Sequence, residues 1–164
     1  RRIRAASTTP IVMLASLDNQ RDAALALEAG ADDYIRMPFG TEELVARVRA
    51  VFRRAYAGLG ASDTIVIGPL EIDTARLSAR IAGDELTLSS TEFALLSYLA
   101  SNSDRVLTHE RILKAVWGED YVDARHMLRV TMCRLRQKLS GSSGGMIRTL
   151  PRVGYRFVGT RQAA

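Results

Sequence analysis

The pattern of apolar residues changes near residue 60, and this change limits the chain to folds that combine two architectures. Before it, short apolar runs alternate with helical patterns; after it come short strand-like pieces, three helical stretches and a hairpin. Between them lies the sequence AGLGAS, residues 57–62, whose small residues are typical of a flexible linker. We therefore expect one domain over residues 1–54, a linker over 55–63 and a second domain over 64–160.

The first segment has the pattern of a β-α-β-α unit. Strands are expected at Pro10–Leu14, a continuous apolar run typical of burial on both faces, and at Asp33–Ile35. Helices are expected from Gln20 to Ala29, ended by Gly30, and from Thr41 to Arg54. Such a unit is half of a doubly wound, flavodoxin-like α/β sheet, so we expect a sheet that is incomplete at its N-terminal side, with an open edge on the first strand. The apolar stripe of the second helix is formed by Leu44, Val48, Val51 and Phe52.

The second segment has the pattern of an α+β winged helix-turn-helix domain. Short strands are predicted at 64–67, 70–72, 76–81 and 85–88, which suggests a small antiparallel sheet. Three helices follow: one capped by Ser89 and running to about Ala100, one from Thr108 to Val116 and one from Asp123 to Leu139. A terminal hairpin over residues 146–158 forms the wing. In this fold the last of the three helices enters the DNA major groove.

The residues of this third helix separate into faces when they are placed at 100° intervals. Leu128, Met132, Leu135 and Leu139 form one narrow apolar stripe that must face the core. The opposite ridge, His126, Val130, Cys133 and Gln137, is nearly uncharged. Cations flank it, with Arg125, Arg129 and Arg136 on one side and Arg134 and Lys138 on the other. This layout suits a groove, with a thin ridge against base edges and cations toward phosphates.

The distribution of charge supports a polyanionic partner. Residues 125–164 carry nine Arg and Lys and no carboxylate, a net charge of +9, within a chain of net charge +5. Arginines also recur in the terminal hairpin, at Arg148, Arg152 and Arg156. The alternative for each element is a solvated basic surface, but two basic elements in one small domain make DNA binding the favoured interpretation.

Other functional classes have little support in the sequence. His109 and His126 lack partners at ligand spacing, and adjacent Asp32 and Asp33 more often begin a strand than bind a metal, so neither an enzyme nor a metal site is predicted. Cys133 leaves thiol sensing conceivable but lacks a resolving cysteine. As the single cysteine, it also fits a reducing cytoplasm. No apolar run is long enough to span a membrane, and RRIRAAS at the start is not a signal peptide.

Specific motifs resemble those of a known family. The stretches LTLSSTEFALLSYLASNSDRVLTHERILKAVWG, LRVTMCRLRQKL and TLPRVGYRFVG are similar to the winged-helix effector domain of OmpR/PhoB response regulators. TPIVMLAS and EAGADDYIRMPFGTEELVARVRAVFRR resemble the C-terminal half of their receiver domain. Within the family, HMLRVTMCRLRQKL is most similar to regulators of Kdp potassium transport. Together these stretches cover nearly the whole chain.

The resemblance implies a set of DNA-contacting positions. His126, Val130 and Arg134 match base-facing positions of the recognition helix, and Thr131 and Arg136 match phosphate-facing ones. Trp117 matches a backbone contact, and residues 118–122 match the loop that touches RNA polymerase in activators. The predicted site further includes Arg129, Lys138, Thr149, Arg152 and Tyr155. Arg152 is displaced by one position from the basic residue of many relatives.

The resemblance also implies signalling positions, with departures. The family's phosphoacceptor and Mg²⁺-binding acids would precede residue 1, so we expect neither a phosphorylation site nor a bound cofactor in this chain. Ala15 and Met37 replace a switch hydroxyl and a lysine, which predicts weak phosphorylation control even in a longer form, while Tyr34 matches the switch aromatic. Dimerisation charges are expected at Asp33, Glu43, Arg47 and Arg54.

The sequence thus predicts the transcription-regulating output component of a two-component phosphorelay. Its expected partners are double-stranded promoter DNA at tandem half-sites, RNA polymerase, a sensor histidine kinase and a second copy bound through the receiver, in the cytoplasm and without a membrane. The alternative is a regulator that acts mainly as a dimerisation or interaction module.

Overall fold

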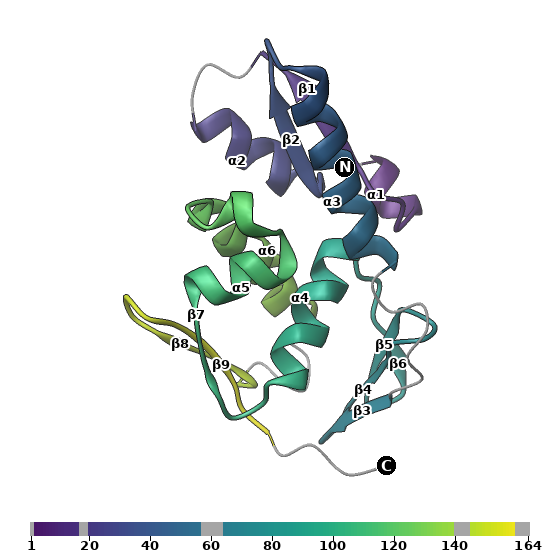
Figure 1. The fold of residues 1–164 in the computed structure, drawn as a ribbon. Helices are drawn as coiled ribbons and strands as arrows, with labels where there is room; N and C mark the ends of the chain where they lie inside the picture. The colour runs from purple at the N-terminus through teal and green to yellow at the C-terminus, as the bar shows by residue number, and fades with distance from the viewer. Residues whose placement is uncertain (1, 17–19, 57–63, 140–144, 160–164) are drawn as a thin grey trace.

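The computed structural model describes residues 2–16, 20–56, 64–139 and 145–159, and its first segment has the expected β-α-β-α order (Figure 1). Helix α1 (Arg2–Ala6) precedes β1 (Val12–Ala15), α2 (Gln20–Glu28), β2 (Asp33–Arg36) and α3 (Thr41–Tyr56). Strands β1 and β2 pair in parallel, as a doubly wound unit requires. Gly30 adopts a φ of 117° just after α2, in the positive region that favours glycine at the end of a helix.

Two expectations for this segment are wrong. Strand β1 is not buried on both faces, because Leu14 is 47% exposed and none of its four residues is fully buried. Among the described residues β1 pairs only with β2, and α2 and α3 contact β2 but pack more extensively against helices of the second segment. Phe52 does not belong to the apolar stripe of α3, since it is 53% exposed while Ala50 and Val51 face the core.

Four short antiparallel strands begin the second segment. Strands β3 (Thr64–Ile67), β4 (Leu70–Asp73), β5 (Ser78–Ile81) and β6 (Asp84–Glu85) lie side by side in chain order. The last strand is shorter than predicted, and Leu88 beyond it packs in the core. This sheet lies beside α4, as Figure 1 shows.

Three helices then form the centre of the second segment. They are α4 (Ser90–Ser101), α5 (His109–Val116) and α6 (Arg125–Leu139), with a short 3₁₀ turn, η1 (Glu119–Tyr121), between the last two. Ser89 and Glu92 form the predicted capping box of α4. Thr108 caps α5 by accepting a hydrogen bond from the amide of Arg111 at 3.2 Å.

The terminal hairpin joins a strand that was not predicted. Strands β8 (Ile147–Leu150) and β9 (Gly154–Phe157) form the wing, and β7 (Val106–Thr108) pairs with β9 on its other side. The approach is so close that a Cβ on Gly154 would lie 1.9 Å from the carbonyl oxygen of Leu107. Only glycine fits there, so the glycine of the turn also allows β7 to complete a three-stranded sheet.

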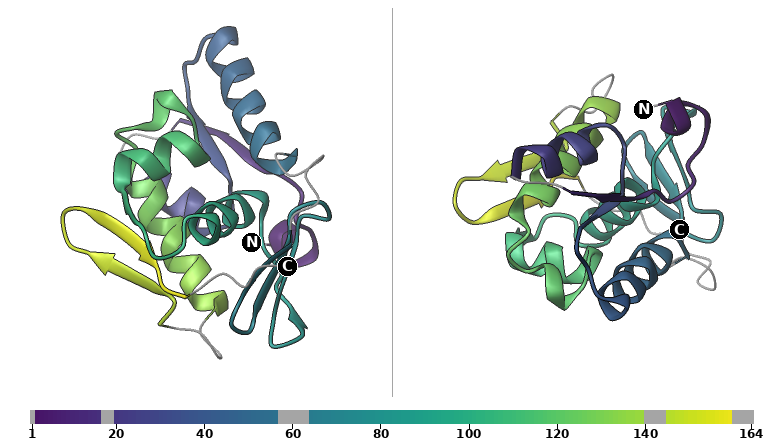
Figure 2. Two further views of the ribbon diagram at one scale, coloured as in Figure 1. Left: turned by 60° about the horizontal axis from the view of Figure 1, so that its bottom comes forward. Right: turned by 90° about the horizontal axis from the view of Figure 1, so that it is seen from above.

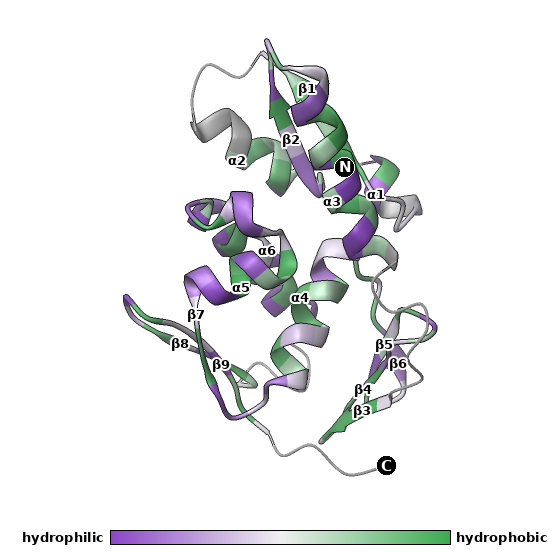
Figure 3. Ribbon diagram, in the orientation of Figure 1, coloured by the Kyte–Doolittle hydropathy of each residue, from purple (hydrophilic) through white to green (hydrophobic). Residues whose placement is uncertain are grey.

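One hydrophobic core unites the two segments. Most of its buried residues belong to β3, β4 and α4–α6, but Leu27 of α2 and Ala50 of α3 belong to the same cluster. Figure 2 shows from two further directions that α2 lies beside α6. In Figure 3 the C-terminal part of α2 is coloured as hydrophobic. Within the described residues, no helix is both long and apolar enough to cross a membrane.

Candidate nucleic-acid interface

Helix α6 is anchored by the apolar stripe that its sequence predicts. Leu128, Met132, Leu135 and Leu139 are each at most 2% exposed, and the helix packs against both α4 and α5. The side turned to solvent carries Arg125, Arg129, Cys133 and Gln137. Burial of the stripe therefore orients a basic and polar surface outward.

Arg136 joins this helix to the wing. Its Nη2 donates to the carbonyl oxygen of Ile147 at 2.9 Å and to Oγ1 of Thr149 at 2.7 Å. Its guanidinium carbon lies 5.6 Å from the centre of the Tyr155 ring, a cation–π contact. Tyr155 is itself only 8% exposed. Arg136 and Tyr155 thus hold the hairpin in place, and Thr149 and Arg152 remain on the exposed side of the wing.

The first segment covers the other flank of α6. The Tyr34 hydroxyl lies 3.3 Å from Nε2 of His126, and Nη1 of Arg134 donates to the carbonyl oxygen of Leu27 at 3.1 Å. Val130 lies between these contacts on the helix and is 8% exposed. Of the three residues predicted to face bases, His126 and Arg134 therefore contact the protein's own first segment in this structure, and Val130 is buried between them.

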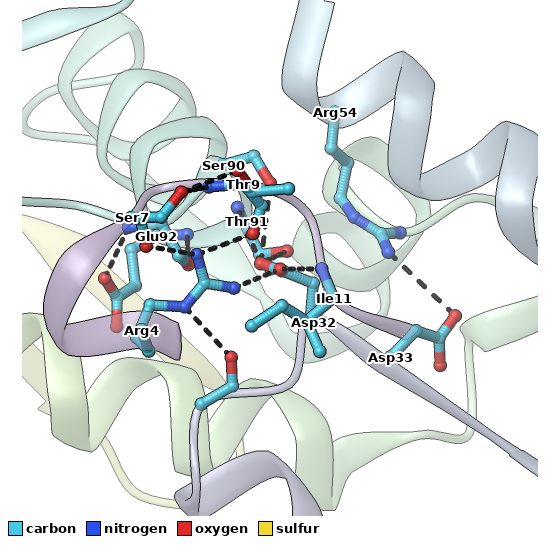
Figure 4. A network of polar contacts seen from close by, with 12 residues as sticks. Arg4, Ser7, Thr9, Ile11, Asp32, Asp33, Arg54, Ser90, Thr91 and Glu92 are labelled. Atoms are coloured by element: carbon cyan, nitrogen blue, oxygen red, sulfur yellow. Dashed lines mark hydrogen bonds and ion pairs between the residues drawn. The ribbon is translucent and has the colours of Figure 1, made fainter. Parts of the chain in front are cut away.

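Asp32 fastens the first segment to the beginning of α4 (Figure 4). Its carboxylate accepts hydrogen bonds from Oγ1 of Thr91 and the amide of Ile11, both at 2.9 Å, and pairs with Arg4 at 2.5 Å. A carboxylate at this position also interacts favourably with the positive end of the helix dipole. Asp32, from the first segment, thus supplements the N-terminal cap of α4 in the second segment.

Asp33 makes a second attachment, to η1. It accepts a short hydrogen bond from the Tyr121 hydroxyl and lies 3.6 Å from Arg47 and 3.9 Å from Arg54. Glu43 completes the set by pairing with Arg47 at 2.9 Å. The four residues predicted to form a dimer interface are therefore grouped inside one chain, and Asp33 and Arg54 are at most 3% exposed.

Burial perturbs the ionisable groups between the segments. Desolvation raises the pKa of Asp33 and of Tyr121 and lowers the pKa of Arg54. The pKa of His126 is lowered by burial first and by the nearby charge of Arg129 second. The shifts of Asp33 and Arg54 both show that burial outweighs their mutual attraction at 3.9 Å.

The loop before α6 also touches the first segment. Tyr121 is 6% exposed, and Nη2 of Arg53 donates to the carbonyl oxygen of Trp117 at 3.3 Å. The side chain of Trp117, which is predicted to contact a DNA backbone, is fully buried in the core of this structure. Its large apolar ring packs where the end of α5 meets the core.

The remaining predicted residues lie in varied environments. Thr131 is 6% exposed, on the core side of α6. Nζ of Lys138 lies 2.6 Å from the Glu92 carboxylate and 2.6 Å from the carbonyl oxygen of Thr87, so it is tied to the protein. Of the switch positions, Ala15 is partly buried at the end of β1 and Met37 is 44% exposed.

Three residues of this surface were missed as functional candidates. The sequence places Asp32 at a strand start, Tyr121 in the loop matched to an RNA polymerase contact, and Glu92 in the first turn of the helix that Ser89 caps. The capping-box spacing predicts the position of Glu92 on its helix but not its partners on α6. These partners are 42 and 46 residues away in the sequence, so helical periodicity cannot reveal them.

Comparisons with known proteins agree with this geometry. Residues 83–157 match the family model described as transcriptional regulatory protein, C terminal. The chain is 38% identical to the sensory transduction protein RegX3 of Mycolicibacterium smegmatis, over 97% of this chain and 72% of RegX3. It is 42% identical to the uncharacterized transcriptional regulatory protein YcbL of Bacillus subtilis, over 94% of this chain and 71% of YcbL.

Solved structures match as well. A mutant of RitR superposes with a TM-score of 0.74 at 26% identity, covering 95% of this chain and 69% of that one. The DNA-binding domain of Klebsiella pneumoniae RstA, solved in complex with the RstA box, matches with a TM-score of 0.53 at 28% identity, over 58% of this chain and 97% of that one. The chain therefore belongs to the OmpR/PhoB family of winged-helix response regulators.

Proposed function

We propose that this chain is a sequence-specific, DNA-binding transcriptional regulator of a two-component system that binds promoter half-sites through α6 and the β8–β9 wing. The observation that carries the proposal is that α6 and the wing, both basic, are joined so that they form one surface. Arg136 fixes the wing to α6, and the exposed arginines Arg125, Arg129, Arg148 and Arg152 all belong to these two elements. Cations placed on both sides of a groove-entering helix position the protein through phosphate contacts.

Half of the predicted base-reading ridge is covered in this structure. His126 and Arg134 contact the first segment and Val130 between them is buried, whereas Cys133 and Gln137 are exposed. A major groove admits a helix only when its ridge is clear of other protein. We therefore propose that residues 1–56 move away from α6 when DNA binds, so that the docked arrangement is a low-affinity state.

The remaining partners follow from the same arrangement. The charged residues Asp33, Arg47 and Arg54 are proposed to form a dimer interface only after release from Tyr121, because they cannot face both at once. Release would also free residues 118–122, the proposed contact with RNA polymerase. A sensor kinase acting on a complete receiver, with its Mg²⁺ ion, is the proposed source of the signal, in the cytoplasm.

The proposal is tested by selecting duplexes from a random DNA pool with the whole chain. We expect one enriched motif, and affinity for it that falls steeply with salt, by roughly 0.9 in log K per log salt for each phosphate contact. Arg129→Ala is expected to weaken binding to all duplexes and to reduce this slope by about 0.9. Arg105→Ala serves as the matched control, because Arg105 is exposed but lies outside α6 and the wing.

Failure to enrich any motif, together with self-association that does not depend on salt, would favour the interaction module instead. The exposed arginines of α6 and the wing favour DNA binding, because these are the elements that enter or flank a groove in this fold.

A further inference from the structure

Glu92 is a buried carboxylate with more partners than a helix cap needs. It is 0% exposed, and its Oε2 accepts the amide of Ser89 at 2.8 Å, which completes the capping box of α4. A cap of this kind is ordinarily formed at the surface, where a neutral glutamine serves as well as a glutamate. A fully buried charge, by contrast, requires compensating cations.

Both cations come from one flank of α6. Nη2 of Arg134 lies 3.0 Å from Oε1 of Glu92, and Nζ of Lys138 lies 2.6 Å from Oε2. Arg134 and Lys138 are four residues apart, so they lie one above the other on the helix. Arg134 retains 17% and Lys138 32% of their side-chain exposure, so each also reaches the surface.

The two ends of the Arg134 guanidinium have different partners. Nη2 points to Glu92, while Nη1 donates to the carbonyl oxygen of Leu27 in the first segment. If the first segment leaves α6, Nη1 loses its acceptor and Nη2 keeps its own. An arginine held at one nitrogen can present the other to an acceptor on a base edge with little loss of side-chain entropy.

We propose that Glu92 is a positioning residue for DNA recognition. It fixes Arg134 so that Nη1 can pass from the Leu27 carbonyl to a base, and it neutralises Lys138 so that this flank does not bind phosphates indiscriminately. This inference rests on the proposed function of α6. Under this proposal the sequence specificity of Arg134, which is only partly exposed, depends on a buried carboxylate that DNA does not contact.

The test compares Glu92→Gln with wild type on the motif duplex from the selection and on a scrambled duplex of the same length. Glutamine can keep the capping hydrogen bond but releases both cations from their charge partner. We expect the ratio of motif to scrambled affinity to fall by about tenfold, the value of one well-oriented base contact. Affinity for the scrambled duplex should rise, with a salt slope steeper by roughly 0.9.

Glu85→Gln is the matched control, because it makes the same change of charge at an exposed residue of β6. A merely structural role for Glu92 would lower the thermal midpoint without changing the affinity ratio of the folded protein. Undocking of the first segment would raise both affinities by the same factor and also leave the ratio unchanged. An unchanged ratio in a folded Glu92→Gln protein therefore overturns the proposal.

Glu92→Asp makes the test independent of how well Glu92→Gln folds, and a double variant shows whether Glu92 acts through Arg134. Glu92→Asp keeps the negative charge but moves it away from Arg134 by the length of one methylene group. The ratio of motif to scrambled affinity should therefore fall, while the salt slope stays at the wild-type value. In an Arg134→Gln background, Glu92→Gln should have no further effect on the ratio, because Glu92 acts through Arg134. A wild-type ratio in Glu92→Asp, or additive effects in the double variant, contradicts the positioning role. A wild-type chain that prefers no duplex contradicts the proposed function itself.

Discussion

At the scale of single residues, Asp33 and its neighbours connect the two segments through buried polar contacts. Asp33 is 0% exposed, and its oxygens face Arg47, Arg54 and the Tyr121 hydroxyl. A buried carboxylate depends on its donors, because each lost donor leaves the desolvation cost uncompensated. The docked arrangement is therefore sensitive to single polar atoms.

Removing the Tyr121 hydroxyl tests this dependence. Tyr121→Phe should reduce the free energy of unfolding by about 1–3 kcal/mol, because Asp33 stays buried with one donor fewer. Urea unfolding monitored by the fluorescence of the single tryptophan, Trp117, measures the change. Tyr98→Phe is the control. An equal loss of unfolding free energy in both variants would show that the hydrogen bond to Asp33 does not stabilise the protein.

His126 adds a dependence on pH. Its pKa lies below the ordinary value of 6.5 in this structure, because burial and Arg129 disfavour the imidazolium. The unfolded chain therefore takes up this proton first, and stability is lost as the pH falls through about 6.5. Unfolding free energies measured across this range should fall less in His126→Gln than in wild type. His109 and Asp33 titrate in both proteins, so an identical pH dependence would refute the assignment to His126.

Residue-scale chemistry was only partly predictable from the sequence. Periodicity placed Arg134 and His126 on the outward half of α6, because every residue of a helix has a fixed angular position. It could not show that Leu27 and Tyr34, about a hundred residues earlier, would cover them. For the same reason it could not show that Asp33 would contact Tyr121 within the same chain.

At the scale of elements, the helices form where caps and apolar spacing in the sequence predict them. Ser89 and Thr108 cap the helices that their positions predict, and the apolar spacing of α6 matches its buried stripe. Strand β7 escaped prediction because it has three residues and pairs with a strand 48 residues later. Strand β1 was predicted to be more buried than it is, since an apolar run does not reveal how many strands will pair beside it.

The capping box of α4 gives an element-scale prediction. Ser89→Ala should lower the free energy of unfolding by about 1 kcal/mol, because the amide of Glu92 loses its acceptor at the helix start. Ser101→Ala at the exposed end of the same helix is the control and should change stability little. Thermal or urea unfolding distinguishes them, and a loss in Ser101→Ala as large as in Ser89→Ala would contradict the role of the cap.

At the scale of the whole molecule, the first segment covers the side of α6 that we propose to bind DNA. Leu27 contributes to the core shared by both segments, and Asp32 and Asp33 attach the first segment to the start of α4 and to η1. The proposed DNA interface includes the same flank of α6 that this segment covers. Docking and DNA binding are thus expected to exclude each other, and their balance sets the apparent affinity.

The dissociation constant for the selected motif duplex, measured for wild type and Leu27→Asp, tests this exclusion most directly. A charge at the buried Leu27 should undock the first segment. If about nine-tenths of the wild-type molecules are docked, the variant should bind roughly tenfold more tightly. Leu25→Asp, which adds the same charge at a leucine that is 50% exposed on the same helix, should bind like wild type. Equal or weaker binding by a folded Leu27→Asp chain would contradict the competition for α6.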